Sequence, residues 1–196
     1  MSLWGAVEGS ESLPKFLTTE QQKDVFANQS GWVVEAGSAM TGNGNTSADP
    51  EVLVAIRNLA GLSGSTGLGE ATVNTVDWNI TTFDKSAGGT LSATVRYNET
   101  VTVATSNPTI IVTNDQRGNH TLTYASGTGT HELTFTLVIG TADAATNAGD
   151  ILSIAAQNIV LAGGSTIKDT SSTPANAELV ISAAQGTASG TITVVA

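Results

Sequence analysis

Two histidines are the strongest candidates for chemistry in a chain without cysteine. His120 and His131 fall in segments that we expect to be strands, on either side of a hairpin at residues 121–130, where they could face each other. A zinc site would need a third ligand with suitable geometry, and Glu132 should point to the opposite face from His131 because side chains alternate along a strand. We therefore expect solvent-facing histidines and no metal site.

Loop aspartates form a second candidate group, because Ca²⁺ takes six to eight oxygens from carboxylates and loop carbonyls. The sequence has no dense run of alternating aspartates, and the alternative is that each side chain caps backbone amides in its own turn. Asp150 and Asp169 are the calcium candidates that we retain. The full group is Asp84, Asp115, Asp143, Asp150 and Asp169.

Patterns for catalysis are missing. A serine or threonine nucleophile needs an oriented base, and no Gly-x-Ser-x-Gly turn links a strand to a helix. The glycine-rich run at residues 61–69 has no lysine, so it does not match a phosphate-binding loop. Two acid pairs, Glu8 with Glu11 and Glu20 with Asp24, lie in polar stretches where acids are usually solvated. We expect no enzymatic activity and no cofactor.

Composition limits the partners. The 196 residues carry 17 acidic and 7 basic side chains, a net charge of -10, so the basic stripe that nucleic-acid binding requires is missing. The absence of cysteine favours folding in a reducing cytoplasm. The first residues have no basic and apolar signal pattern, and no run approaches the roughly 18 apolar residues that cross a bilayer. We expect neither nucleic acid nor membrane as a partner.

Most of the chain consists of short alternating segments rich in threonine, valine and isoleucine, separated by glycine turns. Alternation gives each strand one apolar and one polar face, which predicts two sheets packed face to face, as in an immunoglobulin-like β-sandwich. Trp78 could fill its core or lie at its rim. The expected strands are residues 71–80, 90–97, 101–103, 109–114, 119–124, 131–139, 151–154, 159–161, 177–183 and 190–195.

The first sixty residues have a less regular pattern than the rest of the chain, and they hold two of the three tryptophans. A hydroxyl cap followed by glutamine predicts a short helix at residues 19–27, and residues 32–35 read as a strand. Residues 51–60 fit a strand or a helix, and their β-branched content favours a strand. We divide the chain into an irregular N-terminal docking segment (1–62), a Gly/Ser linker (63–69) and the sandwich (70–196).

The aromatic side chains of the N-terminal segment are candidates for docking. So short and irregular a segment can hardly bury all of them, and aromatics dominate interface energetics when they enter a partner's pocket. The alternative is a local core. The expected docking residues are Trp4, Pro14, Phe16, Phe26, Trp32, Val52, Leu53 and Ile56.

Residues 72–196 resemble bacterial Ig-like repeats of large surface proteins. The resemblance is carried by residues 89–103, 107–110 and 121–135, and by the later runs at residues 148–151 and 158–169. It implies the Ig-like fold, and related repeats sometimes bind calcium between domains.

The N-terminal segment is similar to small virion proteins of contractile-tailed cyanophages and other marine phages. The similar stretches are residues 2–5, 14–17, 31–32 and 50–56. The resemblance implies a virion component whose base docks on the particle while a β domain projects outward. No motif for a particular capsid or tail protein is recognisable.

We therefore expect a non-enzymatic virion protein, made in the host cytoplasm, that decorates the capsid in many copies or as a homo-oligomer. Aromatic and β-edge contacts of the N-terminal segment would clamp neighbouring shell subunits, with the major capsid protein or another virion protein as partner. A tail, neck or fibre component is the alternative. From a different class, a cell-surface adhesin or carbohydrate-binding module would share the sandwich, but it predicts exposed aromatics on the β domain.

Overall fold

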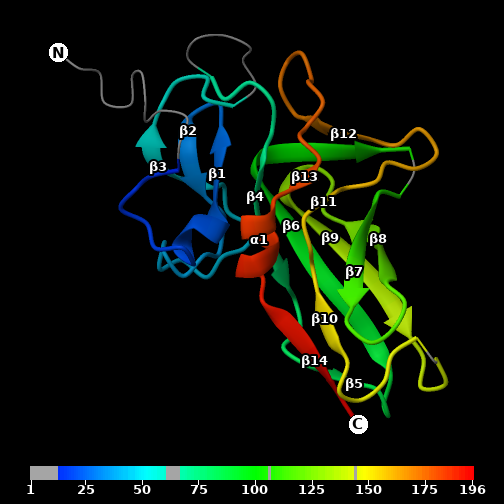
Figure 1. Ribbon diagram of the computed structural model, residues 1–196. Helices are drawn as coiled ribbons and strands as arrows, with labels where there is room; N and C mark the ends of the chain where they lie inside the picture. Colours follow the sequence, from blue (N-terminus) through cyan, green and yellow to red (C-terminus); the bar gives the residue numbers. More distant parts are fainter. Residues whose placement is uncertain (1–12, 61–66, 106, 144) are drawn as a thin grey trace.

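The computed structural model describes residues 13–60, 67–105, 107–143 and 145–196. The chain is built mainly from β-strands, as the alternation predicted. Figure 1 shows two parts side by side: a small N-terminal unit of three strands, and a larger β-domain with one short helix. We call residues 13–60 the N-terminal unit and residues 67–196 the β-domain.

The N-terminal unit contains a single helical turn and three strands. The 3₁₀ turn η1 (Gln21–Asp24) is followed by β1 (Val25–Asn28), β2 (Gly31–Val34) and β3 (Glu51–Ala55). The strands at β2 and β3 were predicted.

The helix predicted at residues 19–27 was wrong in length, because the buried strand β1 begins at Val25. The reciprocal bonds expected of Thr18 and its following glutamine are present, but η1 itself begins after Glu20, which makes no side-chain cap bond. The backbone amide of Thr18 donates to the side chain of Gln21 at 2.9 Å, and the Gln21 amide donates to the Thr18 hydroxyl at 3.3 Å.

The N-terminal unit has a core of its own. Trp32 is 2% exposed and lies among buried aliphatic side chains from the strands and from both flanking segments. Partly buried residues of β3 pack against the same core. The fully buried members are Leu17, Val25, Ala27, Trp32, Val34 and Leu59.

The β-domain holds the remaining described strands and the helix. They are β4 (Val73–Trp78), β5 (Phe83–Asp84), β6 (Gly89–Ala104), β7 (Thr109–Asn114), β8 (His120–Ser126), β9 (Thr130–Ile139), β10 (Ile151–Ser153), β11 (Gln157–Asn158), β12 (Thr166–Asp169), β13 (Val180–Ile181), α1 (Ala183–Ala188) and β14 (Thr191–Val195), with the pair β11 and β13 forming a separate small sheet. The consecutive strands β7, β8 and β9 pair antiparallel, each with the next.

Apolar alternation places the core of the β-domain. In β6, Leu91, Ala93, Val95 and Tyr97 are buried while the residues between them are more exposed or polar. The same pattern continues through β7, β8 and β9. The inward faces pack into one cluster, which Trp78 contacts from a partly buried position. The Trp78 indole N–H donates to the carbonyl of Gly190 at 3.4 Å, so this residue lies at the rim of the core.

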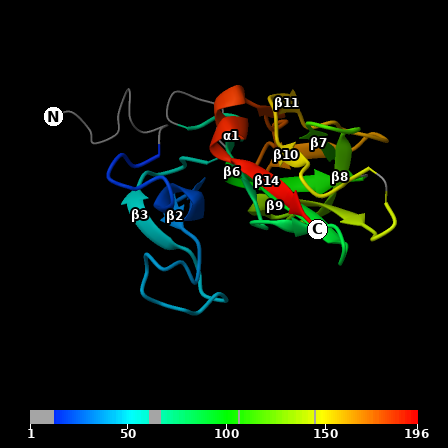
Figure 2. The same cartoon turned by 60° about the horizontal axis from the view of Figure 1, so that its bottom comes forward.

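The two parts are joined through β6, the longest strand. The ladder runs β3–β2–β1–β6–β9–β8–β7–β10–β14–β5, with β4 and β12 also paired to β6. The pairing of β1 with β6 is parallel and brings Ala27 opposite Glu99. Figure 2 shows the N-terminal unit at one side of the β-domain, with the loop between β2 and β3 extending away from it. The pairing of β1 with β6 therefore fixes the orientation of the N-terminal unit relative to the β-domain.

Candidate functional site

The predicted docking residues divide into exposed and buried groups. Phe16 is 65% exposed and Val52 is 51% exposed, so both side chains are accessible to a partner. Leu53 and Ile56 are half-buried and pack against the core around Trp32. Trp4 lies outside the described residues.

Three of the predicted docking residues are buried inside the chain. Trp32 fills the core of the N-terminal unit, and Pro14 is buried one turn before Leu17 of the same core. Phe26 is 7% exposed and stacks on His131 of β9, with ring centroids 4.4 Å apart. For these residues the docking interpretation needs correction, because the fold turns them toward the chain's own cores. The local-core alternative describes them.

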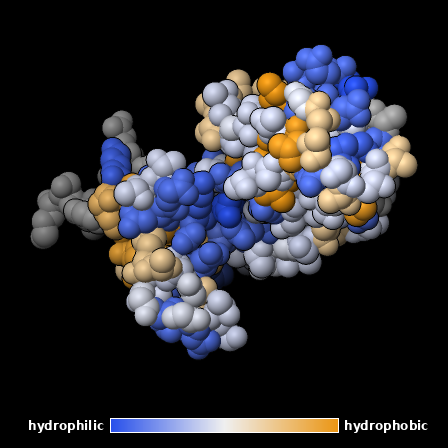
Figure 3. Space-filling view, turned by 90° about the horizontal axis from the view of Figure 1, so that it is seen from below, coloured by the Kyte–Doolittle hydropathy of each residue, from blue (hydrophilic) through white to orange (hydrophobic). Residues whose placement is uncertain are grey.

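The exposed apolar side chains lie on a surface of mixed character. Figure 3 shows hydrophobic colour on the N-terminal unit, next to the grey residues, and separate hydrophobic areas on the β-domain. The exposed apolar residues of the β-domain are mainly aliphatic, with Val138 at 75% the most exposed. Phe16 is therefore the one large aromatic with most of its surface in solvent among the described residues.

Titratable side chains gather where the N-terminal unit meets the β-domain. We call Glu35, His131 and Glu132 the junction cluster: one candidate ligand atom of each lies within 4.8 Å of the others. His131 is only 3% exposed, and its Nε2 lies 3.3 Å from the carbonyl oxygen of Lys23 and 3.9 Å from Oε2 of Glu35. The expectation of a solvent-facing His131 was wrong, because β1 and η1 cover it.

His131 and Glu132 alternate along β9 as expected, with His131 buried and Glu132 half-buried, yet candidate ligand atoms of both side chains lie within 4.8 Å of each other. The register between β6 and β9 runs regularly to Arg96 opposite Glu132 and then shifts, so that Val101 lies opposite Thr130. The extra residues of this irregularity lie in β6, and the alternation of buried and half-buried residues along β9 continues through His131. The imidazole and the Glu132 carboxylate form one cluster with Glu35 of the N-terminal unit, a contact distant in sequence that alternation alone could not reveal.

Burial and like charges shift the pKa values at the junction. Burial raises the pKa of Glu35 to about 7, and the carboxylates of Glu132 and Asp24 add to the shift while Arg96 opposes it. Burial also lowers the pKa of His131, against the attraction of Glu132 and Asp24 for its cationic form. Glu35 therefore exchanges a proton with solvent near neutral pH.

An ion-pair network continues the junction along the sheet. Arg96 donates to Asp77 at 2.8 Å and to Glu132 at 2.6 Å, and Lys23 lies 2.8 Å from the other oxygen of Asp77. Burial opposes the charge of Lys23, but Asp77 and Glu20 hold its pKa above the ordinary value. Lys23 comes from η1, so this network ties the N-terminal unit to β4 and β6.

The side chains of the junction cluster make contacts within the protein. Nε2 of His131 lies 3.3 Å from the carbonyl oxygen of Lys23, which can only accept a hydrogen bond, so this contact forms in the tautomer that is protonated at Nε2 and leaves the lone pair on Nδ1. Glu132 is engaged by Arg96.

His120 is separate from this cluster. It is 4% exposed, and its Nε2 lies 3.0 Å from the hydroxyl of Thr146. The expectation that it faces solvent was also wrong, since the inward face of β8 buries it with Leu122.

The two calcium candidates have hydrogen-bond partners close by. Asp150 accepts from the Asn114 side chain at 2.8 Å and from the Asn147 amide at 2.9 Å. Asp169 accepts from the amides of Ser171 and Ala175 at 3.0 and 3.1 Å. The amide contacts are the turn-capping arrangement that we considered as the alternative to calcium.

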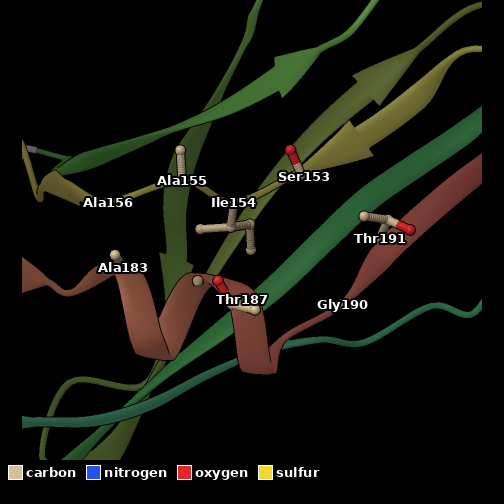
Figure 4. A pocket seen from close by; sticks show the side chains of 9 residues that line it. Ser153, Ile154, Ala155, Ala156, Ala183, Thr187, Gly190 and Thr191 are labelled. Carbon is tan, nitrogen blue, oxygen red and sulfur yellow. The ribbon is translucent and has the colours of Figure 1, made fainter.

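The cavity between β10 and α1 has no ionisable lining. It measures about 400 Å³ and is lined by small or aliphatic residues, among them Ser153, Ile154 and Thr187. Figure 4 shows the hydroxyl groups of Ser153, Thr187 and Thr191 spread over separate elements. Neither a base nor an acid is present among the described residues that line it.

Aromatic side chains of the β-domain do not form an exposed row. Phe83, Tyr97 and Phe135 are buried, while Trp78 and Tyr124 are partly buried against the core. Sugar-binding modules of the kind considered above stack sugars on exposed rings. Among the described residues this platform is missing.

Comparison with known proteins identifies no relative: no family model, no curated protein and no solved structure matches the chain. Within the part of the chain that the structure describes, no helix has the length and apolar character needed to span a bilayer.

Proposed function

We propose that the chain is a non-enzymatic structural protein of a phage virion, a decoration protein that docks on the capsid through its N-terminal unit. The β-domain, which we propose to be an Ig-like sandwich, would face solvent. The partner would be the major capsid protein or another shell protein, and the chain would be present on the particle in many copies.

The exposure of Phe16 carries this proposal. Phe16 has 65% of its surface in solvent while the other described aromatics of the N-terminal unit are buried, and an exposed aromatic is the kind of side chain that anchors an interface when it enters a partner's pocket. Phe16 sits beside Leu17, which is anchored in the core of the unit, so its backbone is held in place. A side chain presented in this way suits insertion into a pocket of a shell subunit.

The rest of the molecule supports a structural role. The cavity near α1 has no ionisable lining, and the junction cluster is engaged in contacts that hold two parts together. A virion protein needs a fixed angle between its base and its outward domain. The β1–β6 pairing and the Lys23–Asp77–Arg96–Glu132 network provide that angle.

Co-sedimentation with phage heads tests the docking surface. Purified chain should pellet with heads of a contractile-tailed marine phage that have been stripped of decoration proteins, and Phe16→Ser should weaken this binding about tenfold or more, as loss of an interface anchor does. Val138→Ser is the matched control, because Val138 is the more exposed side chain but lies on the β-domain.

The proposal fails if the wild-type chain does not bind heads, or if Val138→Ser weakens binding as much as Phe16→Ser. Binding to intact tails with no binding to heads would instead select the tail, neck or fibre alternative.

A further inference from the structure

Strand β3 has one edge that pairs with no other strand in the part of the chain that the structure describes. It stands at the end of the strand order, and among the described strands only β2 pairs with it. The carbonyl of Val54 faces β2, where it would meet a Cβ on Gly31, and the amide of Ile56 donates to Ser30 before β2. Because backbone groups alternate in direction along a strand, the N–H and C=O of Ala55 face the open side.

The other edge strands that the structure describes are either contacted by neighbouring segments or very short, which distinguishes β3. The side chain of Gln185 donates to the carbonyls of Val73 and Asn74 along β4. The segment after β12 covers that strand, since the Ala177 amide donates to the carbonyl of Ile167 at 2.9 Å. At the far end of the order, β5 is only two residues long. An open edge of five residues is the kind of feature that natural proteins protect or use.

The composition of β3 favours pairing of its open edge with another strand. Its sequence, Glu-Val-Leu-Val-Ala, has no lysine and no proline, and Val52 is half in solvent. A bulge at Leu53 interrupts the pairing with β2 and shortens the regular part of the edge. Main-chain bonds along so short a stretch would need support from side chains.

Charges of opposite sign stand at the two ends of this edge. Asp49 and Glu51 lie at its start and Arg57 follows its end, and all three residues are exposed. None of them has an ion-pair partner among the described residues. An antiparallel copy of the same strand would place its Arg57 beside the acidic end, and its acidic end beside Arg57. A parallel copy would bring like charges together.

We propose that β3 pairs antiparallel with β3 of a second copy of this chain, so that two molecules form one continuous sheet through a twofold interface. The same patch serves both molecules, which closes the assembly at two copies. This pairing assigns the β-edge to self-association and leaves Phe16 for the shell contact. It does not depend on which virion protein the N-terminal unit contacts.

Sedimentation of charge-swapped variants of the full chain tests the proposal. The wild-type chain should show a concentration-dependent monomer–dimer equilibrium. Glu51→Arg or Arg57→Glu alone should weaken dimerisation about tenfold or more, because each places like charges together twice across the twofold axis. An equimolar mixture of the two variants should dimerise again, because opposite charges then face each other at both ends.

Lys168→Glu is the matched control, since it makes the same change in net charge as Arg57→Glu on a strand of the β-domain. It should leave the dimer unchanged. A chain that stays monomeric at every concentration overturns the proposal, and so does a mixture of the two swapped variants that associates no better than either alone. Head binding that depends on Phe16 would survive either result, so this failure is distinguishable from failure of the docking function.

Discussion

At the scale of single residues, the most informative side chain is His131. Its sequence context, a strand beginning after a glycine turn, predicts exposure, yet Phe26 stacks on its ring and Glu35 approaches its Nε2. Both partners come from the N-terminal unit, far earlier in the sequence, and no local pattern records such a contact. The histidine is therefore part of the joint between the two parts of the molecule.

The raised pKa of Glu35 predicts a pH-dependent contribution to stability. The folded-state value of about 7 lies above the ordinary value of 4.5, so the folded chain binds more protons between these pH values. The contribution of Glu35 to the free energy of unfolding is therefore greatest below pH 4.5 and falls as pH rises to about 7. His131 acts in the opposite direction, because its pKa is lowered and its neutral form is favoured in the folded state.

Glu35→Gln should remove the contribution of Glu35 to the free energy of unfolding, which falls as pH rises. The variant should gain stability relative to the wild type as pH rises from about 5 to about 7.5, by roughly 1 kcal/mol, since a side chain that is 37% exposed is screened by solvent. Urea unfolding at several pH values measures the difference. Parallel curves for variant and wild type would contradict the assignment.

At the scale of elements, the position of β3 depends on Gly31. This residue has φ of +131°, and a Cβ there would overlap the carbonyl oxygen of Val54 and the amide nitrogen of Ile56. The turn after β1 thus needs glycine both for its backbone conformation and for the close approach of β3. This close approach holds the end of β3 beside β2.

Gly31→Ala should destabilise the chain by more than about 2 kcal/mol, because it combines an unfavourable φ with a steric overlap of backbone. Gly44→Ala is the control, since Gly44 has no positive φ and a methyl group added to its Cα would meet no atom within 4 Å. Thermal unfolding followed by circular dichroism compares them. Equal stability of the two variants would contradict the role given to Gly31.

The elements also show which features a sequence can predict. Strand β7 was predicted with its observed bounds, because alternation from Thr109 to Asn114 is a local signal. Strand β6 was predicted as two pieces, since Asn98 and Glu99 interrupt the alternation, but pairing with β1 and β12 carries the strand through. The helix α1 was missed although Ser182 and Gln185 form a capping box, a signal that could have found it.

Candidate residues were predictable only where exposure follows from local sequence. Phe16 and Val52 are accessible as expected. Trp32 and Phe26 are not, because whether an aromatic side chain meets its own chain or a partner depends on contacts distant in sequence.

At the scale of the whole molecule, the N-terminal unit and the β-domain are held together as one structure. The N-terminal unit and the β-domain share a strand ladder, a ring stack and an ion-pair network. These contacts hold Phe16 and the edge of β3 on one part while the β-domain extends to the other side. A base fixed in this way would set the direction in which the β-domain projects from a particle.

The most direct test of this account is electron cryo-microscopy of phage heads bearing the purified chain. We expect density for the N-terminal unit against the shell, with Phe16 at the contact, and density for the β-domain outside it at the fixed angle seen here. Density that places the β-domain against the shell and the N-terminal unit in solvent, or heads that carry no added density, would contradict the account.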